Sequence, residues 1–278
     1  MKGKESESSF IFALARSAAK SIEEGYYRAV HPPHASGLKP RSLRDALISS
    51  KTMPLLAEIK FTSPAEGKLR PPGDVKRIAM AYERGGVAGI SVLTEPKHFD
   101  GDIRYLPLVK RSVKVPVLMK DIIIDPVQIE SGARMGADAV LFIAAIFMNR
   151  LSRKGLEEML SAAHAAGLEV LMEAHTENEF AFALESDADV VGINNRNLET
   201  LDVSLATSRR LLSGAREVRK DLSRSGRGKP VISESGIRSR KDIEELKQLG
   251  ADGFLVGSAL MKSRDLEAKV RSLTGVAR

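Results

Sequence analysis

The chain has 278 residues, of which 43% are hydrophobic and 28% charged, which is typical of a globular protein with one large domain or two small ones. It contains no cysteine, which excludes disulfides, cysteine-ligated zinc and thiol catalysis. No apolar run approaches the length needed to span a bilayer, and the charged N-terminus lacks the apolar core of a signal peptide. We therefore expect a cytoplasmic protein with no membrane partner.

The formal net charge of +7 fits either an anionic small substrate or a nucleic acid. Aromatic residues make up 5% of the chain and tryptophan is absent, so few aromatic side chains are available to stack on the bases of a single-stranded nucleic acid. The basic segment 209–229 is the best candidate for nucleic-acid binding. Its interspersed Glu217 and Asp221 are more typical of a solvated helix followed by a loop, so we expect no nucleic-acid partner.

Two helices are predicted before the first strand. Apolar periodicity predicts the first from Ser8 to Tyr27, and the prolines of His31-Pro-Pro-His34 end it. Two histidines in such a loop, without carboxylates, favour a solvated loop over a metal site. The second helix, Ser42 to Ser49, begins at a serine N-cap. We expect residues 1–50 to be a helical extension that packs on a barrel formed by residues 51–278, as one domain overall.

From the strand Pro54–Ile59 onward, apolar strands alternate with helices. The further strands are expected at 87–93, 115–119, 137–143, 168–172, 189–193, 230–233 and 251–256. The helices between and after them are expected at 74–84, 102–113, 125–135, 151–166, 176–185, in a longer region from 204, at 239–249 and at 263–273. Near-continuous apolar strands are typical of a parallel sheet buried on both faces, and eight βα units predict a (β/α)8 TIM barrel. An open doubly wound sheet is the alternative, but no Gly-x-Gly-x-x-Gly turn follows an early strand.

Polar residues stand at the predicted C-terminal strand ends, where the active sites of such barrels lie. Glu58 and Lys60 are two apart near the end of the first strand, so they point to the same side. Four later strands lead directly into polar residues, namely Lys120, Glu173, Asn194 and Glu234. One such pair would be a structural ion pair. Their convergence on one rim predicts a catalytic pocket for acid–base chemistry.

Small residues follow the last two strands. Ser235-Gly236 and Gly257-Ser258 occupy the loops where backbone N–H groups of a barrel commonly approach a phosphate. Ser63 in the first loop adds a hydroxyl. The sequence therefore predicts a phosphate site. No cluster of histidines and carboxylates with metal-ligand spacing is visible, and we expect neither a metal nor another cofactor.

Several motifs together resemble the indole-3-glycerol phosphate synthase family. They are Ala57–Lys60 with Ser63-Pro64, Ser91–Gly101, Pro116–Asp121, Met172-Glu173, Gly192–Thr200, Ser233–Ile237 and Val256–Ser258. The resemblance covers about Leu56 to Met261, and an N-terminal segment that covers the substrate also suits this family. It implies a carbon–carbon lyase of tryptophan biosynthesis. The implied substrate is 1-(2-carboxyphenylamino)-1-deoxyribulose 5-phosphate, and the implied products are indole-3-glycerol phosphate, CO₂ and water.

The resemblance also implies roles for the charged rim residues. Lys120 corresponds to the general acid that protonates the substrate carbonyl, and Glu173 to the carboxylate that assists dehydration. Lys60 corresponds to the lysine that holds the anthranilate carboxylate and is a second candidate proton donor. Glu58 and Glu234 correspond to the carboxylates that orient these lysines. Which lysine acts as the acid at which step stays open.

The remaining implied roles concern substrate binding. Asn194, counted with the catalytic group, and Arg196 position the substrate. The other implied substrate-binding residues are Ser63, Phe99 and Ser235, and the implied phosphate-binding residues are Ser63, Gly236, Gly257 and Ser258.

Two positions depart from the family pattern. Phe61 replaces a frequent arginine or lysine after Lys60, in a segment expected to be a mobile loop. Ile122 replaces a frequent aromatic residue two positions after Lys120, which keeps an apolar wall but implies weaker binding of the anthranilate ring.

Other barrels remain as alternatives. Phosphoribosylanthranilate isomerase, or another barrel acting on a phosphosugar, would share the phosphate loops but not the charged rim. A barrel that binds a phosphate ligand without turnover would not need the complete rim. The sequence is compatible with a monomer and does not fix the oligomeric state.

Overall fold

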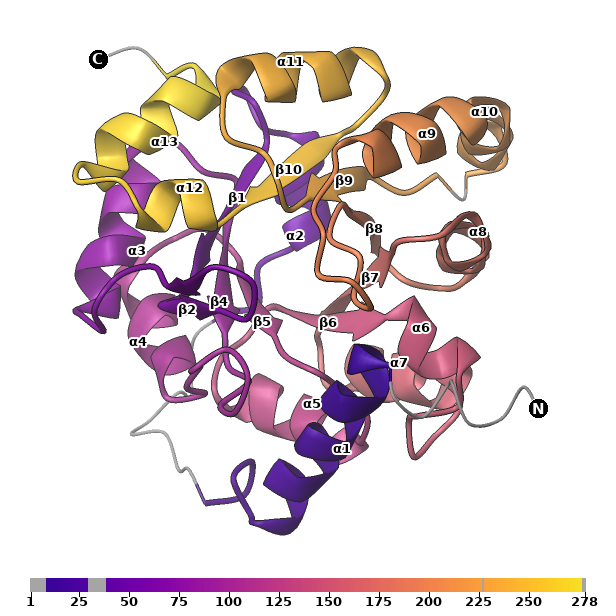
Figure 1. Cartoon of the computed structure of the whole chain (residues 1–278). Coiled ribbons are helices and arrows are strands. Elements are labelled where there is room, and N and C mark those ends of the chain that lie inside the picture. The colour runs from indigo at the N-terminus through magenta and orange to yellow at the C-terminus, as the bar shows by residue number, and fades with distance from the viewer. Residues whose placement is uncertain (1–8, 30–38, 227, 277–278) are drawn as a thin grey trace.

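Eight parallel strands close into a barrel with helices around it (Figure 1). The structure is a computed structural model, and it describes residues 9–29, 39–226 and 228–276. The barrel strands are β1 (Leu55–Ile59), β4 (Gly89–Leu93), β5 (Val117–Lys120), β6 (Ala139–Ile143), β7 (Glu169–Ala174), β8 (Val190–Asn194), β9 (Val231–Glu234) and β10 (Gly253–Val256). Each strand pairs with its neighbour along the chain, and β1 pairs with β10. The predicted (β/α)8 barrel is confirmed.

The strands form where apolar and β-branched residues are buried on both faces. Every residue of β1, β4, β6 and β8 is buried, so these four strands lack the apolar–polar alternation of a half-exposed sheet. The few charged residues of the strands stand at their C-terminal ends, except for Glu169, which begins β7. Burial of apolar side chains therefore stabilises the barrel, and most of the charged side chains of the strands lie at its C-terminal end.

The outer helices agree closely with the predicted positions. They are α3 (Val75–Arg84), α4 (Tyr105–Ser112), α5 (Pro126–Arg134), α7 (Leu156–Ala165), α8 (Glu177–Glu185), α9 (Ala206–Gly214), α10 (Arg216–Arg224), α11 (Arg240–Gln248) and α13 (Leu266–Thr274). Side-chain caps define several starts. Asp74 accepts hydrogen bonds from two backbone N–H groups of α3, and both Asp125 and Ser239 form capping boxes.

Some boundaries differ from the prediction. The helix expected from residue 151 begins at Leu156, and the long helical region from Ser204 is two helices that meet at Ala215. Three short features were not predicted: α6 (Ala144–Met148), α12 (Ser258–Met261) and the hairpin of β2 (Thr62–Ser63) with β3 (Gly67–Lys68). Each is too short to show a periodic apolar pattern.

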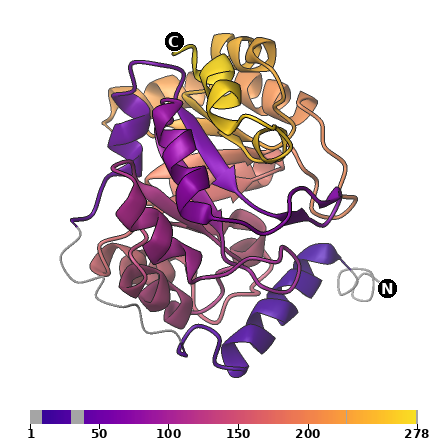
Figure 2. The same cartoon turned by 90° about the vertical axis from the view of Figure 1, so that its left-hand side faces the viewer.

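The two helices before β1 lie at opposite ends of the barrel, as Figure 2 shows for the two indigo helices. Leu14 of α1 (Phe10–Glu23) lines a cavity at the C-terminal mouth. Leu43 and Leu47 of α2 (Leu43–Ile48) are buried against the start of the barrel strands. The Ser42 N-cap is confirmed, because its side chain accepts a hydrogen bond from the Asp45 N–H.

The first helix ends at Glu23 and continues as turns, earlier than the predicted Tyr27. The loop with His31 and His34 lies outside the described residues. Within the described ranges, no helix combines the length and apolarity that crossing a bilayer requires.

Candidate active site

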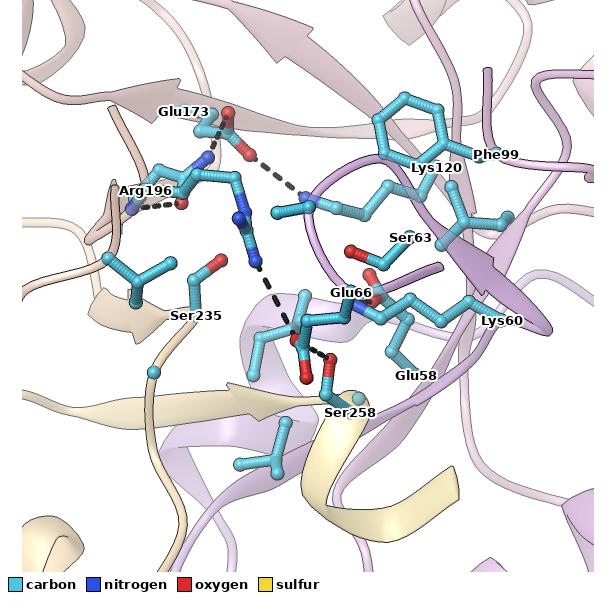
Figure 3. A pocket seen from close by; sticks show the side chains of 18 of the residues that line it. Glu58, Lys60, Ser63, Glu66, Phe99, Lys120, Glu173, Arg196, Ser235 and Ser258 are labelled. Carbon is cyan, nitrogen blue, oxygen red and sulfur yellow. Dashed lines mark hydrogen bonds and ion pairs between the residues drawn. The ribbon is translucent and has the colours of Figure 1, made fainter. Parts of the chain in front are cut away.

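A cavity of about 680 Å³ opens at the C-terminal ends of the strands (Figure 3). Most of the site residues expected from the sequence line it, namely Glu58, Lys60, Ser63, Phe99, Lys120, Glu173, Asn194, Arg196, Ser235, Gly236, Gly257 and Ser258. Glu234 is the exception. Its side chain is 1% exposed and lies beneath the cavity, where it contacts Lys120. The barrel thus brings together residues that are far apart in the sequence.

Lys120 is the centre of the polar floor. It ends β5, and its Nζ lies 2.9 Å from Glu173 Oε2 on β7 and 2.9 Å from Glu234 Oε2 on β9. Asn194, at the end of β8, donates a 2.8 Å hydrogen bond from Nδ2 to Glu173 Oε1. The ends of β5, β7, β8 and β9 therefore place one ammonium, two carboxylates and one amide in direct contact.

Lys60 and Glu58 form a second pair at the end of β1. Their Nζ and Oε1 atoms are 2.7 Å apart, and Glu58 is almost fully buried. The other Glu58 oxygen, Oε2, receives no hydrogen bond from any described residue. Gly257 is required beside this pair, because a Cβ there would lie 2.5 Å from Glu58 Oε1.

The electrostatic environment keeps the ammonium of Lys120 charged. Burial alone would lower the pKa of Lys120, but the carboxylates of Glu173, Glu234 and Glu58 outweigh it and hold that pKa well above its usual value. Burial would likewise raise the pKa of Glu58, yet the nearby Lys60 and Lys120 lower it below its usual value. Glu58 is therefore a carboxylate, and Lys120 carries a proton, at neutral pH.

Glu234 differs from Glu58. Burial raises its pKa to about 7, despite the opposing charge of Lys120, and the nearby Glu173 adds to the rise. Its Oε1 receives no hydrogen bond within the described ranges. Gly192 on β8 leaves the space for this oxygen, since a Cβ there would lie 2.0 Å from Glu234 Oε1. The group under Lys120 is thus close to its own protonation point near neutral pH.

A tight turn after β9 forms the other end of the cavity. Ser235 and Gly236 both have left-handed backbone angles, with φ of 67° and 80°. A serine in this region is uncommon and must be held by its surroundings. Asn195 holds it, because its Nδ2 donates hydrogen bonds of 2.9 Å to Glu234 O and 3.1 Å to Ser235 O.

The sequence did not single out Asn195, which is 1% exposed and contributes to the site through the turn that it holds. Its only sequence signal is the position beside Asn194. Glu66 was also missed. Its carboxylate lies in the cavity, yet it stands in a loop with no strand end to mark it.

The two departures from the family pattern are both buried. Phe61 is 2% exposed, and its ring centre is 5.9 Å from that of Tyr105 in an edge-to-face contact. Phe61 therefore anchors the start of the first loop, which corrects the expectation of a residue in a loose loop. Ile122 is 5% exposed and lines the cavity as an apolar wall.

The N-terminal segment reaches the residue next to Lys120. Asp121 is 1% exposed and accepts hydrogen bonds from Tyr27 Oη at 2.9 Å and from Thr94 Oγ1. Burial raises the pKa of Asp121 to about 7. Tyr27 thereby ties the segment after α1 to the β5 end of the site.

Histidines contribute little to this cavity. His175 Nδ1 lies 2.7 Å from the backbone oxygen of Asn194, and His175 is not part of the cavity lining. No group of three or more histidines, aspartates and glutamates suited to a metal ion occurs among the residues described here.

Comparisons with known proteins show the family. A family model described as indole-3-glycerol phosphate synthase matches residues 20–273. A protein of that name from Methanopyrus kandleri is 46% identical over 88% of this chain and 91% of its own length. Another from Dehalococcoides mccartyi is 40% identical over 81% of this chain and 83% of its own.

Solved structures support the fold alone. Thiamine phosphate pyrophosphorylase from Pyrococcus furiosus has a TM-score of 0.55 at 17% identity and covers 84% of this chain and 96% of its own. N-acetylmannosamine-6-phosphate 2-epimerase from Clostridium perfringens has a TM-score of 0.57 at 15% identity and covers 81% of this chain and 93% of its own. The family match and the sequence identity of the relatives carry the assignment: this chain belongs to the indole-3-glycerol phosphate synthase family.

Proposed function

We propose that this chain closes the indole ring of 1-(2-carboxyphenylamino)-1-deoxyribulose 5-phosphate and releases indole-3-glycerol phosphate, CO₂ and water. Its family membership supports the reaction. The observation that carries the residue roles is the contact of the Lys120 ammonium with Glu173 and Glu234 at 2.9 Å each, on the floor of the cavity. Acid–base catalysis of this kind needs a proton donor and a carboxylate within hydrogen-bond reach of the same atoms.

In the first step, the ring carbon that bears the carboxylate attacks the ketone carbon of the sugar chain. Lys120 donates a proton to the ketone oxygen, which becomes a hydroxyl group. Loss of CO₂ then restores the aromatic ring. Lys60 holds the carboxylate until it leaves, and Glu58 orients Lys60 from 2.7 Å.

The second step removes water and forms the indole double bond. The departing hydroxyl needs one proton, and the carbon beside the nitrogen must lose one. Glu173 takes the latter proton as the base, and Lys60 gives the former. Asn194 supports this role because its amide fixes one Glu173 oxygen at 2.8 Å.

The phosphate lies at the opposite end of the cavity. The Ser235-Gly236 turn and the Gly257-Ser258 start of α12 offer backbone N–H groups and hydroxyls there, and Ser63 adds a further hydroxyl. Arg196 lies between Glu173 and Ser258, and Phe99 lies beside Lys120 (Figure 3). Both line the cavity, where we expect them to contact the substrate.

The organisation of the whole chain belongs to the same proposal. Residues 1–50 are a helical extension whose first helix covers the substrate, and residues 51–278 are the barrel. The protein works as a monomer in the cytoplasm, with a phosphosugar as its partner and without nucleic acid. The basic segment supports this, because Lys220, Arg224 and Arg219 each pair with a carboxylate of the chain.

Indole fluorescence tests the reaction directly. The chain has no tryptophan, so the fluorescence of the indole product would be measured over a low protein background. We expect a rise on mixing with the substrate, and a loss of about a thousandfold or more in kcat for Lys120→Ala and a smaller but large loss for Glu173→Gln. A folded wild-type protein that binds the substrate without a fluorescence rise would refute the reaction. Full activity in Lys120→Ala would refute the residue roles alone.

A further inference from the structure

Glu66 is a third carboxylate in the cavity, and no step proposed above uses it. It stands in the turn between β2 and β3 and lies between Arg196 and Ser258 (Figure 3). Its Oε1 accepts a 2.7 Å hydrogen bond from Ser258 Oγ and lies 3.8 Å from Arg196 Nη2. Its Oε2 forms an ion pair with Lys262 Nζ, just after α12. One carboxylate thus takes a hydroxyl, an ammonium and a guanidinium.

These donors are the kind that a phosphate dianion requires. Ser258 belongs to the proposed phosphate site, Arg196 is assigned to substrate positioning, and Lys262 also lines the cavity. Glu66 is ionised in this position. Burial raises its pKa, but the hydrogen bonds from Lys262 and Ser258 outweigh burial and lower the pKa below its usual value.

A carboxylate and a phosphate cannot share these donors. Two anions at hydrogen-bond distance of the same hydroxyl and ammonium would repel each other strongly in a partly enclosed cavity. A phosphate dianion carries more charge and more acceptor oxygens than a carboxylate, so it is the stronger ligand for this set.

The loop that carries Glu66 can yield without disturbing the core. β2 and β3 have two residues each, and both residues of β3 are exposed. A hairpin of this size has little stability of its own. Its base is fixed by the buried Phe61, and on the far side Arg70 Nε donates a 3.0 Å hydrogen bond to Met261 O. A change at Glu66 therefore stays within the tip.

We propose that Glu66 is an internal competitor for the phosphate group of the substrate and product. Binding of the phosphate to Ser258 and Lys262 displaces the Glu66 carboxylate. The competitor lowers the affinity for phosphate, favours release of the product and disfavours analogues that lack a dianion. This inference rests on the phosphate site of the proposed function and adds a residue that opposes binding there.

The test is a calorimetric titration with inorganic phosphate and with indole-3-glycerol phosphate at neutral pH, together with KM for the substrate. Glu66→Gln keeps the shape of the side chain and removes its charge. Glu157→Gln removes an equal charge from an exposed position of α7, away from the cavity, and serves as the matched control. We expect Glu66→Gln to tighten both ligands by about three- to tenfold and to lower KM, since partly exposed ion pairs have modest strength. Glu157→Gln should leave the affinity for both ligands and the KM unchanged.

The sign of the effect decides the inference. A residue that only positions Ser258 and Lys262 would weaken phosphate binding when replaced, so unchanged or weaker binding in Glu66→Gln overturns the competitor. Ser258→Ala separates this failure from that of the proposed site, because it should weaken both ligands. Unchanged binding in Ser258→Ala would overturn the phosphate site and the competitor together, whereas turnover of the substrate by the wild type tests the reaction independently.

Discussion

The two ends of the barrel both carry buried acidic residues, but with different partners. At the N-terminal end, Asp138 is saturated. Its Oδ2 accepts a 2.9 Å hydrogen bond from Val117 N, and its Oδ1 accepts one of 2.8 Å from Arg41 N and pairs with Lys110. Other acids at strand starts follow the same pattern, with backbone N–H donors for Glu169, Asp189 and Asp252.

At the C-terminal mouth, Glu58, Glu173 and Glu234 are held by lysine and asparagine side chains. Glu58 Oε2 and Glu234 Oε1 are buried without a hydrogen bond from the residues that the structure covers. A buried oxygen without a partner costs stability, and such groups are retained where chemistry needs them. Carboxylates held by backbone N–H groups thus fix the strand starts, whereas the carboxylates of the reacting end are held by side chains, and two of them keep a buried oxygen without a partner among the described residues.

The largest expected effect on stability comes from the saturated end. The side chains of Lys110 and Asp138 are 2% and 0% exposed, so Lys110→Met leaves a buried carboxylate without its cation. We expect a loss of about 3–5 kcal/mol in the free energy of unfolding, measured by urea denaturation. The kcat of the folded fraction should stay unchanged. A large fall in kcat without a loss of stability would remove the distinction between the two ends.

Gly192→Ala tests the mouth without replacing a charged residue. The added Cβ would lie 2.0 Å from Glu234 Oε1, so the carboxylate must shift from its present position. We expect kcat to fall by about 10- to 100-fold, because small misplacements of catalytic groups are costly. Gly155→Ala is the control, since the space around its Cβ is open. Equal kcat values for the two variants would contradict the tight placement of Glu234.

The pH dependence of stability gives the smallest effect. The pKa of Glu234 is raised to about 7 by burial, so the folded protein holds this proton more tightly than the unfolded chain. The stability that it contributes is fully present below the unfolded pKa of about 4.5 and is lost as pH rises through 7. The free energy of unfolding should therefore fall by about 2 kcal/mol between pH 5 and pH 7 because of this group.

Urea denaturation at several pH values measures this slope. Glu234→Gln should remove the part of the pH dependence that comes from Glu234. The part that comes from Asp121, whose pKa is also raised to about 7, should remain. The Glu157→Gln variant should keep the full slope. If Glu234→Gln and the wild type show the same slope, the burial of an ionisable carboxylate under Lys120 is not the cause.

Sequence reasoning found the parts of the site that stand at strand ends. The strand rhythm places Lys120, Glu173, Asn194 and Glu234 on one rim, because parallel strands of a barrel end on one face. A strand that is buried on both faces shows as an apolar run in the local sequence, whichever strands it pairs with. The eight strands, and with them the barrel, could therefore be predicted.

Contacts between residues far apart in the sequence could not be predicted in this way. Glu66 meets Ser258 and Lys262 across 192 and 196 residues, and no local pattern signals such a pair. The same holds for the two helices before β1, which pack at opposite ends although they are neighbours in the sequence. The backbone donors of Asp138 likewise depend on strand register, which the sequence does not show.

The most direct test compares one acid from each end of the barrel. Glu173→Gln and Asp138→Asn each remove one negative charge, and both kcat and the free energy of unfolding are measured for each. We expect Glu173→Gln to lose about 100-fold or more in kcat with a change below about 1 kcal/mol in stability. Asp138→Asn should lose about 2–3 kcal/mol in stability and keep the kcat of the folded fraction. The reverse pattern, or the same pattern for both variants, would contradict the division of the barrel into a stabilising end and a reacting end.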